Sequence, residues 1–214
     1  MPQVFGENSH RCPNPLQLTL QDGPPVLLRP VLPADRERIE RGVAALSSES
    51  RYFRFFTPAV RLSDQQLRYF SEVDQRNHVA WIALDASNPK HPGLGIARFV
   101  RSREDPKVAE VAFAVIDAYQ GRGVGTTLLA VLYLVAQPLV VAVLRAVVLG
   151  ENTRVTNWLL GLGATESWDS SEHRLDLIVH RDPTLLPRTP SGENFRHAIE
   201  AVQSLARRND VRHG

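Results

Sequence analysis

Hydrophobic and polar positions along the chain predict a mixture of strands and amphipathic helices. Short apolar runs bounded by turn-forming residues occur at residues 25–31, 78–85, 93–102 and 108–117, a pattern typical of β-strands. The turn composition of residues 88–93 separates two of these runs. We therefore expect a sheet in which several strands follow one another closely along the chain.

Two helices are predicted between the first two strands. The first begins near Pro33, and the second is capped by Ser63 and Asp64; apolar residues follow each start at helical spacing. Residues 47–58 between them mix aromatic and basic side chains and end at a proline. We expect a structured loop there.

The most apolar stretch of the chain runs from Leu128 to Leu144. Gln137 and Pro138 interrupt it, and a membrane span needs about 20 apolar residues. We therefore predict a buried helix that ends near Gln137 and a buried strand over 139–149, and no membrane segment.

The last third of the chain predicts one more helix and a hairpin. The helix covers 151–164, where Gly161 and Gly163 are suitable C-terminal stops. Residues 164–168 and 173–180 are the two strands of the hairpin.

Three segments are predicted: an extended lead-in over 1–25, one domain over 26–182, and a tail over 183–214. The tail opens with a proline-rich linker and continues as a helix capped by Ser191. The apolar face of this helix is expected to pack on its own domain, or alternatively to form a homodimer or partner contact. That face comprises Phe195, Ala198, Ile199, Val202, Leu205 and Ala206.

Composition narrows the function classes. The 214 residues are 43% hydrophobic and carry a net charge of +2, without a long basic block, which argues against a nucleic-acid partner. A single cysteine, Cys12, excludes an intramolecular disulfide and a cysteine-based zinc site. The scattered histidines lack metal-ligand spacing, so no metal is expected. The N-terminus lacks the order of segments found in signal peptides, so we expect a cytoplasmic protein.

A glycine-rich stretch between a strand and a helix is the strongest chemical signal. Gly121, Gly123 and Gly125 alternate with other residues, and Arg122 lies among them. Unpaired N–H groups at a helix start attract anions, and glycines let a phosphate approach them closely. The spacing fits neither a dinucleotide fingerprint nor a P-loop. A tight turn without a ligand is the alternative that the glycines alone leave open.

The segment Gln120-Gly121-Arg122-Gly123-Val124-Gly125 resembles the Gln/Arg-x-x-Gly-x-Gly/Ala signature of the GNAT acyltransferase superfamily. The element order over about residues 26–180 is also similar. Residues 46–58 and 109–125 look most like the catalytic domain of Pat-type bacterial protein lysine acetyltransferases. This resemblance implies an α/β (α+β) GNAT fold: a mixed, mostly antiparallel, twisted sheet of six to seven strands flanked by helices, with a splayed strand pair.

The resemblance also implies a set of residues that bind acetyl-CoA, used as a co-substrate. The pantetheine arm would contact backbone groups of the fourth strand and an asparagine after the fifth, and the glycine segment would bind the pyrophosphate. The implied residues are Phe113, Ala114, Val115, Gln120, Gly121, Arg122, Gly123, Val124, Gly125, Thr126 and Asn152.

Glu110 is the candidate general base. It is a carboxylate inside an apolar strand, where burial would raise its pKa to a useful range; the alternative is an edge-strand glutamate that faces water. Its position matches the glutamate that Pat-like enzymes use as a base. A free N–H near Val115 is the expected oxyanion donor. Three positions depart from the family: Leu159 replaces a frequent tyrosine acid, Ala164 replaces a usual aromatic residue, and Val140 replaces a frequent glycine.

Two functions remain open at this point. The first is an acetyl-CoA-dependent N-acetyltransferase whose acceptor is a primary amine, on a protein lysine or a small molecule. The second is a GNAT-like sensor or scaffold that binds acetyl-CoA without turnover. The aromatic and basic side chains of the segment 51–56 either line the acceptor site or form hydrophobic cover between helices.

Overall fold

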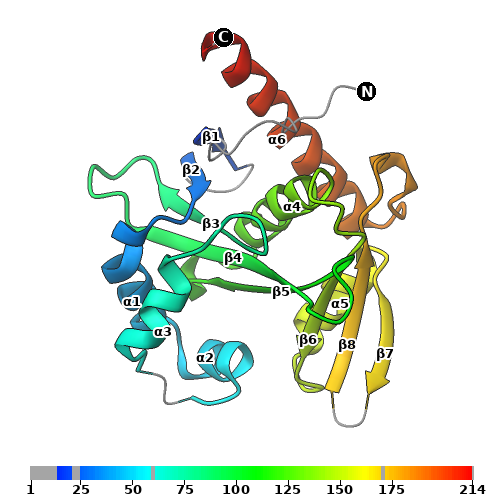
Figure 1. The fold of residues 1–214 in the computed structure, drawn as a ribbon, viewed down its shortest axis with the longest axis horizontal. Coiled ribbons are helices and arrows are strands. Elements are labelled where there is room, and N and C mark those ends of the chain that lie inside the picture. Colours follow the sequence, from blue (N-terminus) through cyan, green and yellow to red (C-terminus); the bar gives the residue numbers. More distant parts are fainter. Residues whose placement is uncertain (1–13, 21–24, 59–60, 170–171, 214) are drawn as a thin grey trace.

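One eight-stranded sheet runs through the molecule in the order β1-β2-β3-β4-β5-β6-β8-β7 (Figure 1). The computed structural model describes residues 14–20, 25–58, 61–169 and 172–213. The strands are β1 (Leu16–Thr19), β2 (Pro25–Pro30), β3 (His78–Asp85), β4 (Gly93–Arg101), β5 (Val108–Val115), β6 (Val143–Val148), β7 (Thr165–Asp169) and β8 (Glu172–Ile178). Neighbouring strands are antiparallel except β5 and β6, which are parallel. The predicted mixed, mostly antiparallel sheet is confirmed.

The sheet has one strand more than the upper limit predicted, because the lead-in contributes β1. Residues 16–20 alternate apolar and polar side chains, and Leu16 and Leu20 are buried. This alternation is the signal that the sequence analysis missed. Residues 1–13 lie outside the described residues.

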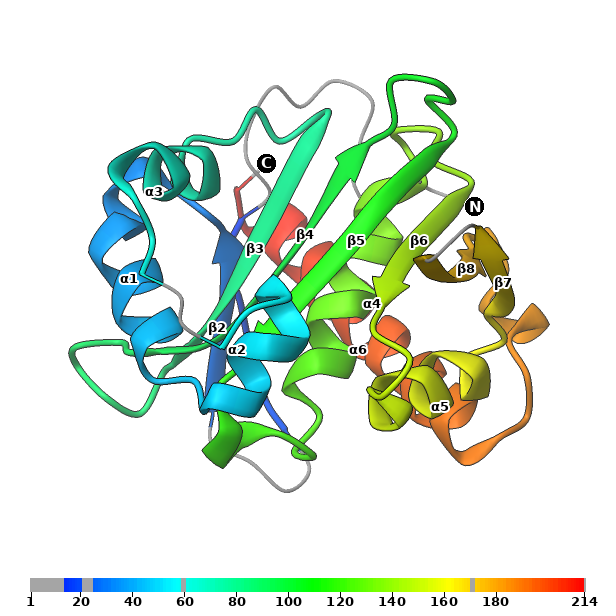
Figure 2. The same cartoon turned by 90° about the horizontal axis from the view of Figure 1, so that it is seen from below.

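Helices cover both faces of the sheet (Figures 1 and 2). They are η1 (Pro33–Asp35), α1 (Arg36–Ala44), α2 (Ser48–Phe55), α3 (Asp64–Ser71), η2 (Asp117–Tyr119), α4 (Val124–Ala136), α5 (Thr153–Gly161), η3 (Pro183–Leu185) and α6 (Pro190–His213). The larger hydrophobic core lies between the sheet, α4 and α6, and a smaller one lies under α1 and α3.

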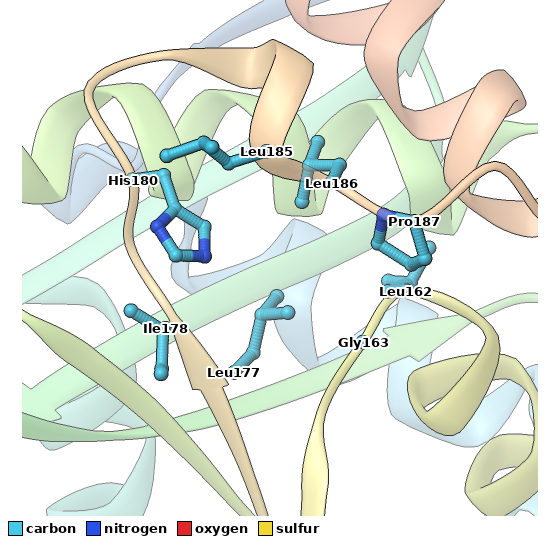
Figure 3. A pocket seen from close by; sticks show the side chains of 8 residues that line it. All are labelled: Leu162, Gly163, Leu177, Ile178, His180, Leu185, Leu186 and Pro187. Carbon is cyan, nitrogen blue, oxygen red and sulfur yellow. The ribbon is translucent and has the colours of Figure 1, made fainter.

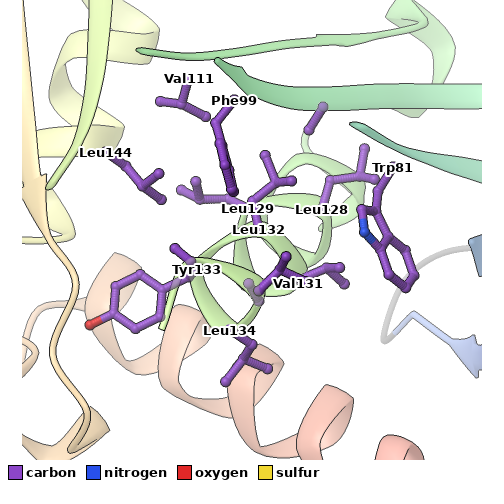
Figure 4. Packing of buried hydrophobic residues seen from close by; sticks show 14 of the residues in the cluster. Trp81, Phe99, Val111, Leu128, Leu129, Val131, Leu132, Tyr133, Leu134 and Leu144 are labelled. Atoms are coloured by element: carbon purple, nitrogen blue, oxygen red, sulfur yellow. The ribbon is translucent and has the colours of Figure 1, made fainter. Parts of the chain in front are cut away.

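The apolar stretch is a buried helix and a buried strand, as predicted. α4 is apolar on all sides because it lies between the sheet and α6. Figure 4 shows Leu129 and Leu132 beside Phe99 of β4, with Leu134 directed toward α6. In the described part of the chain, no helix combines the length and the apolarity needed to cross a membrane.

The tail packs on its own domain. Phe195, Ile199 and Val202 on α6 are buried in the larger core, which confirms the first of the two expectations for this face. The helix begins at Pro190 and its cap is Thr189, whose hydroxyl accepts a hydrogen bond from the Gly192 N–H at 2.9 Å. The prediction of Ser191 as the cap was therefore wrong by two residues.

The segment expected to be a structured loop forms α2. The Ser47 hydroxyl caps it by accepting a hydrogen bond from the Ser50 N–H at 3.1 Å, and the helix ends where Phe56 adopts the left-handed conformation. Eight residues form a marginal helix by themselves. Contacts outside the helix must stabilise it, and those contacts belong to the site.

Candidate functional site

The site is built around a parallel strand pair that separates. β5 and β6 pair only where Val108–Glu110 lies beside Val143–Arg145. β5 then continues to Val115 with a partner on its β4 side alone, and Figure 2 shows β5 and β6 diverging, with α2 near one strand and α5 near the other. The splayed pair implied by the resemblance is present.

The register of β4 against β5 decides which backbone groups face this opening. The Ile116 N–H donates to the Leu94 carbonyl at 3.0 Å. Because hydrogen-bonded and non-hydrogen-bonded residue pairs alternate in an antiparallel ladder, every second residue of β5 counted back from Ile116 is hydrogen-bonded to β4. Ala114 pairs with Ile96 through its backbone, whereas the backbone groups of Phe113 and Val115 point away from β4. Of the three residues expected to contact pantetheine, Phe113 therefore presents a free N–H and carbonyl, Val115 presents a free N–H, and Ala114 presents neither.

Two aromatic rings close the far side of the opening. The ring of Phe113 meets that of Trp158 on α5 edge-on, with 5.2 Å between centroids. Leu159, at the position where the resemblance led us to look for a tyrosine acid, is buried in the core. The apolar wall therefore offers no acid at that position.

The glycine segment forms a tight left-handed turn into α4. Gly121 and Gly123 have φ of 73° and 84°, values that strain other L-residues. None of the N–H groups of residues 121–126 donates a hydrogen bond to another described residue. The start of α4 therefore presents a row of free donors at the positive end of the helix dipole.

Gln120 ties this turn to its neighbours. Its amide nitrogen donates to the Val115 carbonyl at 3.0 Å and to the Ser50 hydroxyl at 3.1 Å. Its oxygen accepts from Arg154 on α5 at 2.9 Å. The Gln120 side chain, expected to hold pyrophosphate, is thus engaged in positioning the turn.

Arg154 is a site residue that the sequence analysis did not identify. Its guanidinium lies 3.6 Å from the place where a Cβ on Gly121 would stand, and the side chain is exposed. Arg122 is also exposed and lies over the Tyr119 ring at 5.7 Å. Two guanidinium groups therefore flank the row of free N–H groups.

Asp117 docks α2 onto the end of β5. Its carboxylate accepts hydrogen bonds from the Ser47 N–H and hydroxyl at 2.9 and 2.7 Å and from the Ser50 hydroxyl at 2.7 Å. Burial alone would raise the pKa of Asp117, but these hydrogen bonds hold it below its usual value. Only the tertiary structure brings these residues, about 70 positions apart, together to stabilise α2.

Asn152 follows β6 and caps α5. Its side-chain oxygen accepts from the Val155 N–H at 3.3 Å, and the residue is buried. The side-chain amide nitrogen makes no hydrogen bond to a described residue. That group remains free for the contact with pantetheine that the resemblance implies.

Glu110 is exposed, so the expectation of a buried carboxylate was wrong. The strand alternation places its side chain on the sheet face of α1, α2 and α3, together with Ala112 and Ala114. No described residue forms a hydrogen bond or salt bridge with its carboxylate. The cation that interacts with it is Arg54 of α2, which packs against β5.

The same sheet face holds a buried arginine. Arg98 on β4 is 5% exposed and lies between Ala80 and Ala112 of the adjacent strands. One guanidinium nitrogen contacts His78 Nε2 at 3.0 Å, another donates to the Phe70 carbonyl at 3.3 Å, and the group lies 4.4 Å from the Phe70 ring centroid.

Burial dominates the titration of this cluster. It lowers the pKa of Arg98 to about 9, with a further contribution from Arg54. Burial and the Arg98 charge lower the pKa of His78 to about 4, so this imidazole is neutral at pH 7. Burial also lowers the pKa of Arg54, while the charge of Glu110 opposes that effect.

Phe55 and Phe70 pack together beside this cluster and cover the smaller core. Thus Phe55 provides hydrophobic cover, while the charge of Arg54 on the same helix interacts with that of Glu110. The expectation of hydrophobic cover is therefore confirmed for Phe55, and the acceptor-site role of the segment 51–56 stays a prediction.

Elsewhere, a cavity of about 250 Å³ lies under the linker that follows β8. Figure 3 shows its lining, which includes Leu177, His180 and Pro187. It lies apart from the splayed strands and contains none of the expected site residues. Across the described residues, no group of three or more acidic, histidine or cysteine side chains is arranged to bind a metal.

Comparison with known proteins gives consistent results. Residues 26–165 match the acetyltransferase (GNAT) domain model. The chain is 38% identical to Acetyltransferase Pat of Mycolicibacterium smegmatis over 151 residues, covering 70% of this chain and 44% of that protein. It is 32% identical to an acetyltransferase of Pseudomonas aeruginosa over 111 residues, covering 52% of this chain and 59% of that protein. The chain thus spans about half the length of these curated relatives.

Among solved structures, the GNAT domain of S. lividans PAT superposes with a TM-score of 0.69 at 29% identity, covering 77% of this chain and 96% of that one. A cAMP-binding acyltransferase from Mycobacterium smegmatis superposes with a TM-score of 0.56 at 29% identity, covering 90% of this chain and 56% of that one. The matching domain model spans well over half of the sequence. This chain belongs to the GNAT acetyltransferase family.

Proposed function

We propose that this protein is an acetyl-CoA-dependent N-acetyltransferase that acetylates a primary amine, on a protein lysine or a small molecule. Residues 26–182 would form the catalytic domain. The observation that carries the proposal is the opening between β5 and β6 beside the free N–H groups of residues 121–126. Names of similar proteins support the same class of reaction.

In this proposal the pyrophosphate of acetyl-CoA binds the row of free N–H groups from Gly121 to Thr126. The helix dipole and two flanking guanidinium groups, those of Arg122 and Arg154, favour its negative charge. The pantetheine arm then extends along β5 as an added strand and pairs with the free N–H and carbonyl of Phe113 and the free N–H of Val115. Asn152 supplies a further amide contact at the β6 side.

The position of the thioester follows from the strand geometry. At about 3.4 Å per residue, Phe113 lies about 10 Å along β5 from Glu110, and Val115 about 17 Å. The Phe113 N–H is the nearer free donor, so we assign the oxyanion contact to it in place of Val115.

Glu110 serves as the general base through a water molecule. Its carboxylate cannot span the distance of about 10 Å to the thioester held at Phe113, so a bridging water must carry the proton. An ammonium group has a pKa near 10.4 and must lose a proton before it attacks. The amine nitrogen then bonds to the thioester carbon, the carbon–sulfur bond breaks, and coenzyme A leaves as a thiolate. Thiols have a pKa of about 8.5, so the thiolate departs without a protein acid, in agreement with Leu159 at the tyrosine position.

The test measures thiol release from acetyl-CoA and mass-spectrometric acetylation of proteins in a cell extract. Glu110→Gln is expected to lower kcat about 100-fold, the size of a general-base effect, with little change in the affinity for acetyl-CoA. Glu104→Gln is the matched control, because Glu104 is an exposed carboxylate on the turn before β5. Full activity of the Glu110→Gln protein would refute the assignment of the base. Binding of acetyl-CoA without acetylation of any protein or amine would favour the sensor function.

A further inference from the structure

Two arginines near the proposed acceptor site, Arg54 and Arg98, have no carboxylate of a described residue within hydrogen-bonding contact. Arg98 is nearly inaccessible, and its contacts are a neutral imidazole, a backbone carbonyl and an aromatic face. A buried charge without an opposite charge costs several kcal/mol. This arrangement is not what stability alone would select.

Arg54 is the accessible member of the pair. It is half-buried on α2, lies 5.1 Å from the Phe55 ring centroid, and makes no hydrogen bond or salt bridge to another described residue. The exposed carboxylate of Glu110 is the anionic group whose charge acts on it at neutral pH. The guanidinium donors of this partly exposed side chain therefore have no acceptor among the described residues.

The charges of the cluster are unbalanced. Arg54 and Arg98 contribute two positive charges and Glu110 one negative charge, while His78 is neutral at pH 7. A plain alkylammonium acceptor would add a third positive charge. An acceptor that brings a carboxylate along with its ammonium adds no net charge, and its carboxylate would give the arginines a second anionic partner.

We infer that the acceptor carries a carboxylate close to its amine, and that Arg54 binds this carboxylate while the amine faces Glu110. The buried Arg98 supplies positive potential behind Arg54 and acts as a positioning residue, because its guanidinium is covered by Phe70 and His78. This inference rests on the proposed function and adds the substrate class. The carboxylate is either that of a free amino acid or that of an acidic residue beside a lysine.

Two matched substrate pairs test the inference with the full chain and acetyl-CoA. Nα-acetyl-lysine and its carboxamide differ only in the carboxylate of a free amino acid. Lysine peptides flanked by Glu or by Gln differ in the same way within a polypeptide. We expect kcat/KM to be at least about tenfold higher for the carboxylate member of one pair, the effect of one charge-assisted hydrogen bond. The pair that shows the preference identifies the source of the carboxylate.

Arg54→Gln should reduce that preference to near unity, and Arg54→Lys should retain part of it. Arg41→Gln is the matched control, because Arg41 is an exposed arginine on α1 that pairs with Glu37; it should keep the full preference. Equal use of both members by the wild-type protein, or a preference that survives in Arg54→Gln, would overturn the inference while leaving the acetyltransferase proposal intact. Failure to bind acetyl-CoA or to acetylate any amine would count against the proposed function instead. In that case, calorimetric titration with Nα-acetyl-lysine and its carboxamide still tests the carboxylate site, and equal or undetectable heats for both would refute it.

Discussion

Val140 stands in a backbone conformation that suits glycine. After α4 the Val140 N–H donates to the Gln137 carbonyl at 3.1 Å, and the Val141 N–H donates to the Ala136 carbonyl at 3.0 Å. These two bonds form a Schellman motif, in which the residue at C′ is left-handed and usually glycine. Val140 occupies that position with φ of 59°, and 68% of it is exposed. The family glycine is thus replaced at a site whose geometry still requires a positive φ.

The cost of this replacement can be isolated by comparing Val140→Ala with Val140→Gly. A left-handed conformation costs an L-residue about 1–2 kcal/mol, whereas glycine loses about 0.5–1 kcal/mol through the entropy of the unfolded chain. The step from alanine to glycine at position 140 should therefore raise the free energy of unfolding by about 0.5–1 kcal/mol. Because Val140 is mostly exposed, little burial is lost when its methyl groups are removed.

Ala142→Gly is the matched control for the same step. Ala142 is exposed, its φ is not positive, and its N–H donates to the Lys107 carbonyl at 2.7 Å. Glycine there should lower the free energy of unfolding by about 0.5–1 kcal/mol. Urea unfolding of the wild type and three variants measures the difference between the two steps, expected to be about 1–2 kcal/mol. If glycine destabilises both positions equally, the assignment of strain to Val140 is incorrect.

Two further predictions concern the turn and a buried ion pair. Gly123→Ala should raise the KM for acetyl-CoA and lower the free energy of unfolding by about 1 kcal/mol, because Gly123 has a φ of 84° although a Cβ there would have room. The control is Gly42→Ala, which lies in α1 with open space around it and should stabilise the protein by about 0.5–1 kcal/mol. A loss of stability in Gly42→Ala would contradict the reasoning. Asp35 is buried and accepts from Arg29 at 2.6 Å and Arg38 at 2.7 Å; burial opposes ionisation, but these contacts lower its pKa. Asp35→Asn should therefore cost about 3 kcal/mol at pH 7. The difference in unfolding free energy between the wild type and this variant is fully present above the unfolded-state pKa of Asp35, near 3.9. It should shrink as the pH falls through the folded-state pKa, which is lower. Unfolding measured across an acid titration would refute the prediction if the difference stayed constant.

Local patterns predicted most of the elements because each is specified by adjacent residues. The strand over 78–85 matches β3 in both limits, and the Ser63 cap begins α3 where the sequence placed it. α2 was missed because its stability comes from a distant residue, Asp117, which accepts the hydrogen bonds that hold its first turn. No window around 47–58 contains that partner.

For the site, too, the sequence predicted some features and packing decided the others. A carboxylate within an apolar strand was evident at Glu110, but the strand pattern does not show which helices cover each face of a sheet. The structure places Glu110 at an uncovered part of the face that also buries Arg98. Arg54 lies in a segment that the sequence offered as a candidate acceptor-site lining, whereas Arg154 joined the site only through packing, since its helix is far from residue 110 in the sequence.

The sequence by itself determined the glycine turn, the strand before it and the helix after it, because glycine spacing and apolar runs act over a few residues. Only the tertiary structure decided which donors around that turn are free. A backbone group in β5 is available to a ligand only where β6 has separated from it, and β6 lies some thirty residues further along the chain. Hydrogen-bond availability is a property of strand pairing, so it emerges when the sheet assembles and cannot be assigned to any single segment.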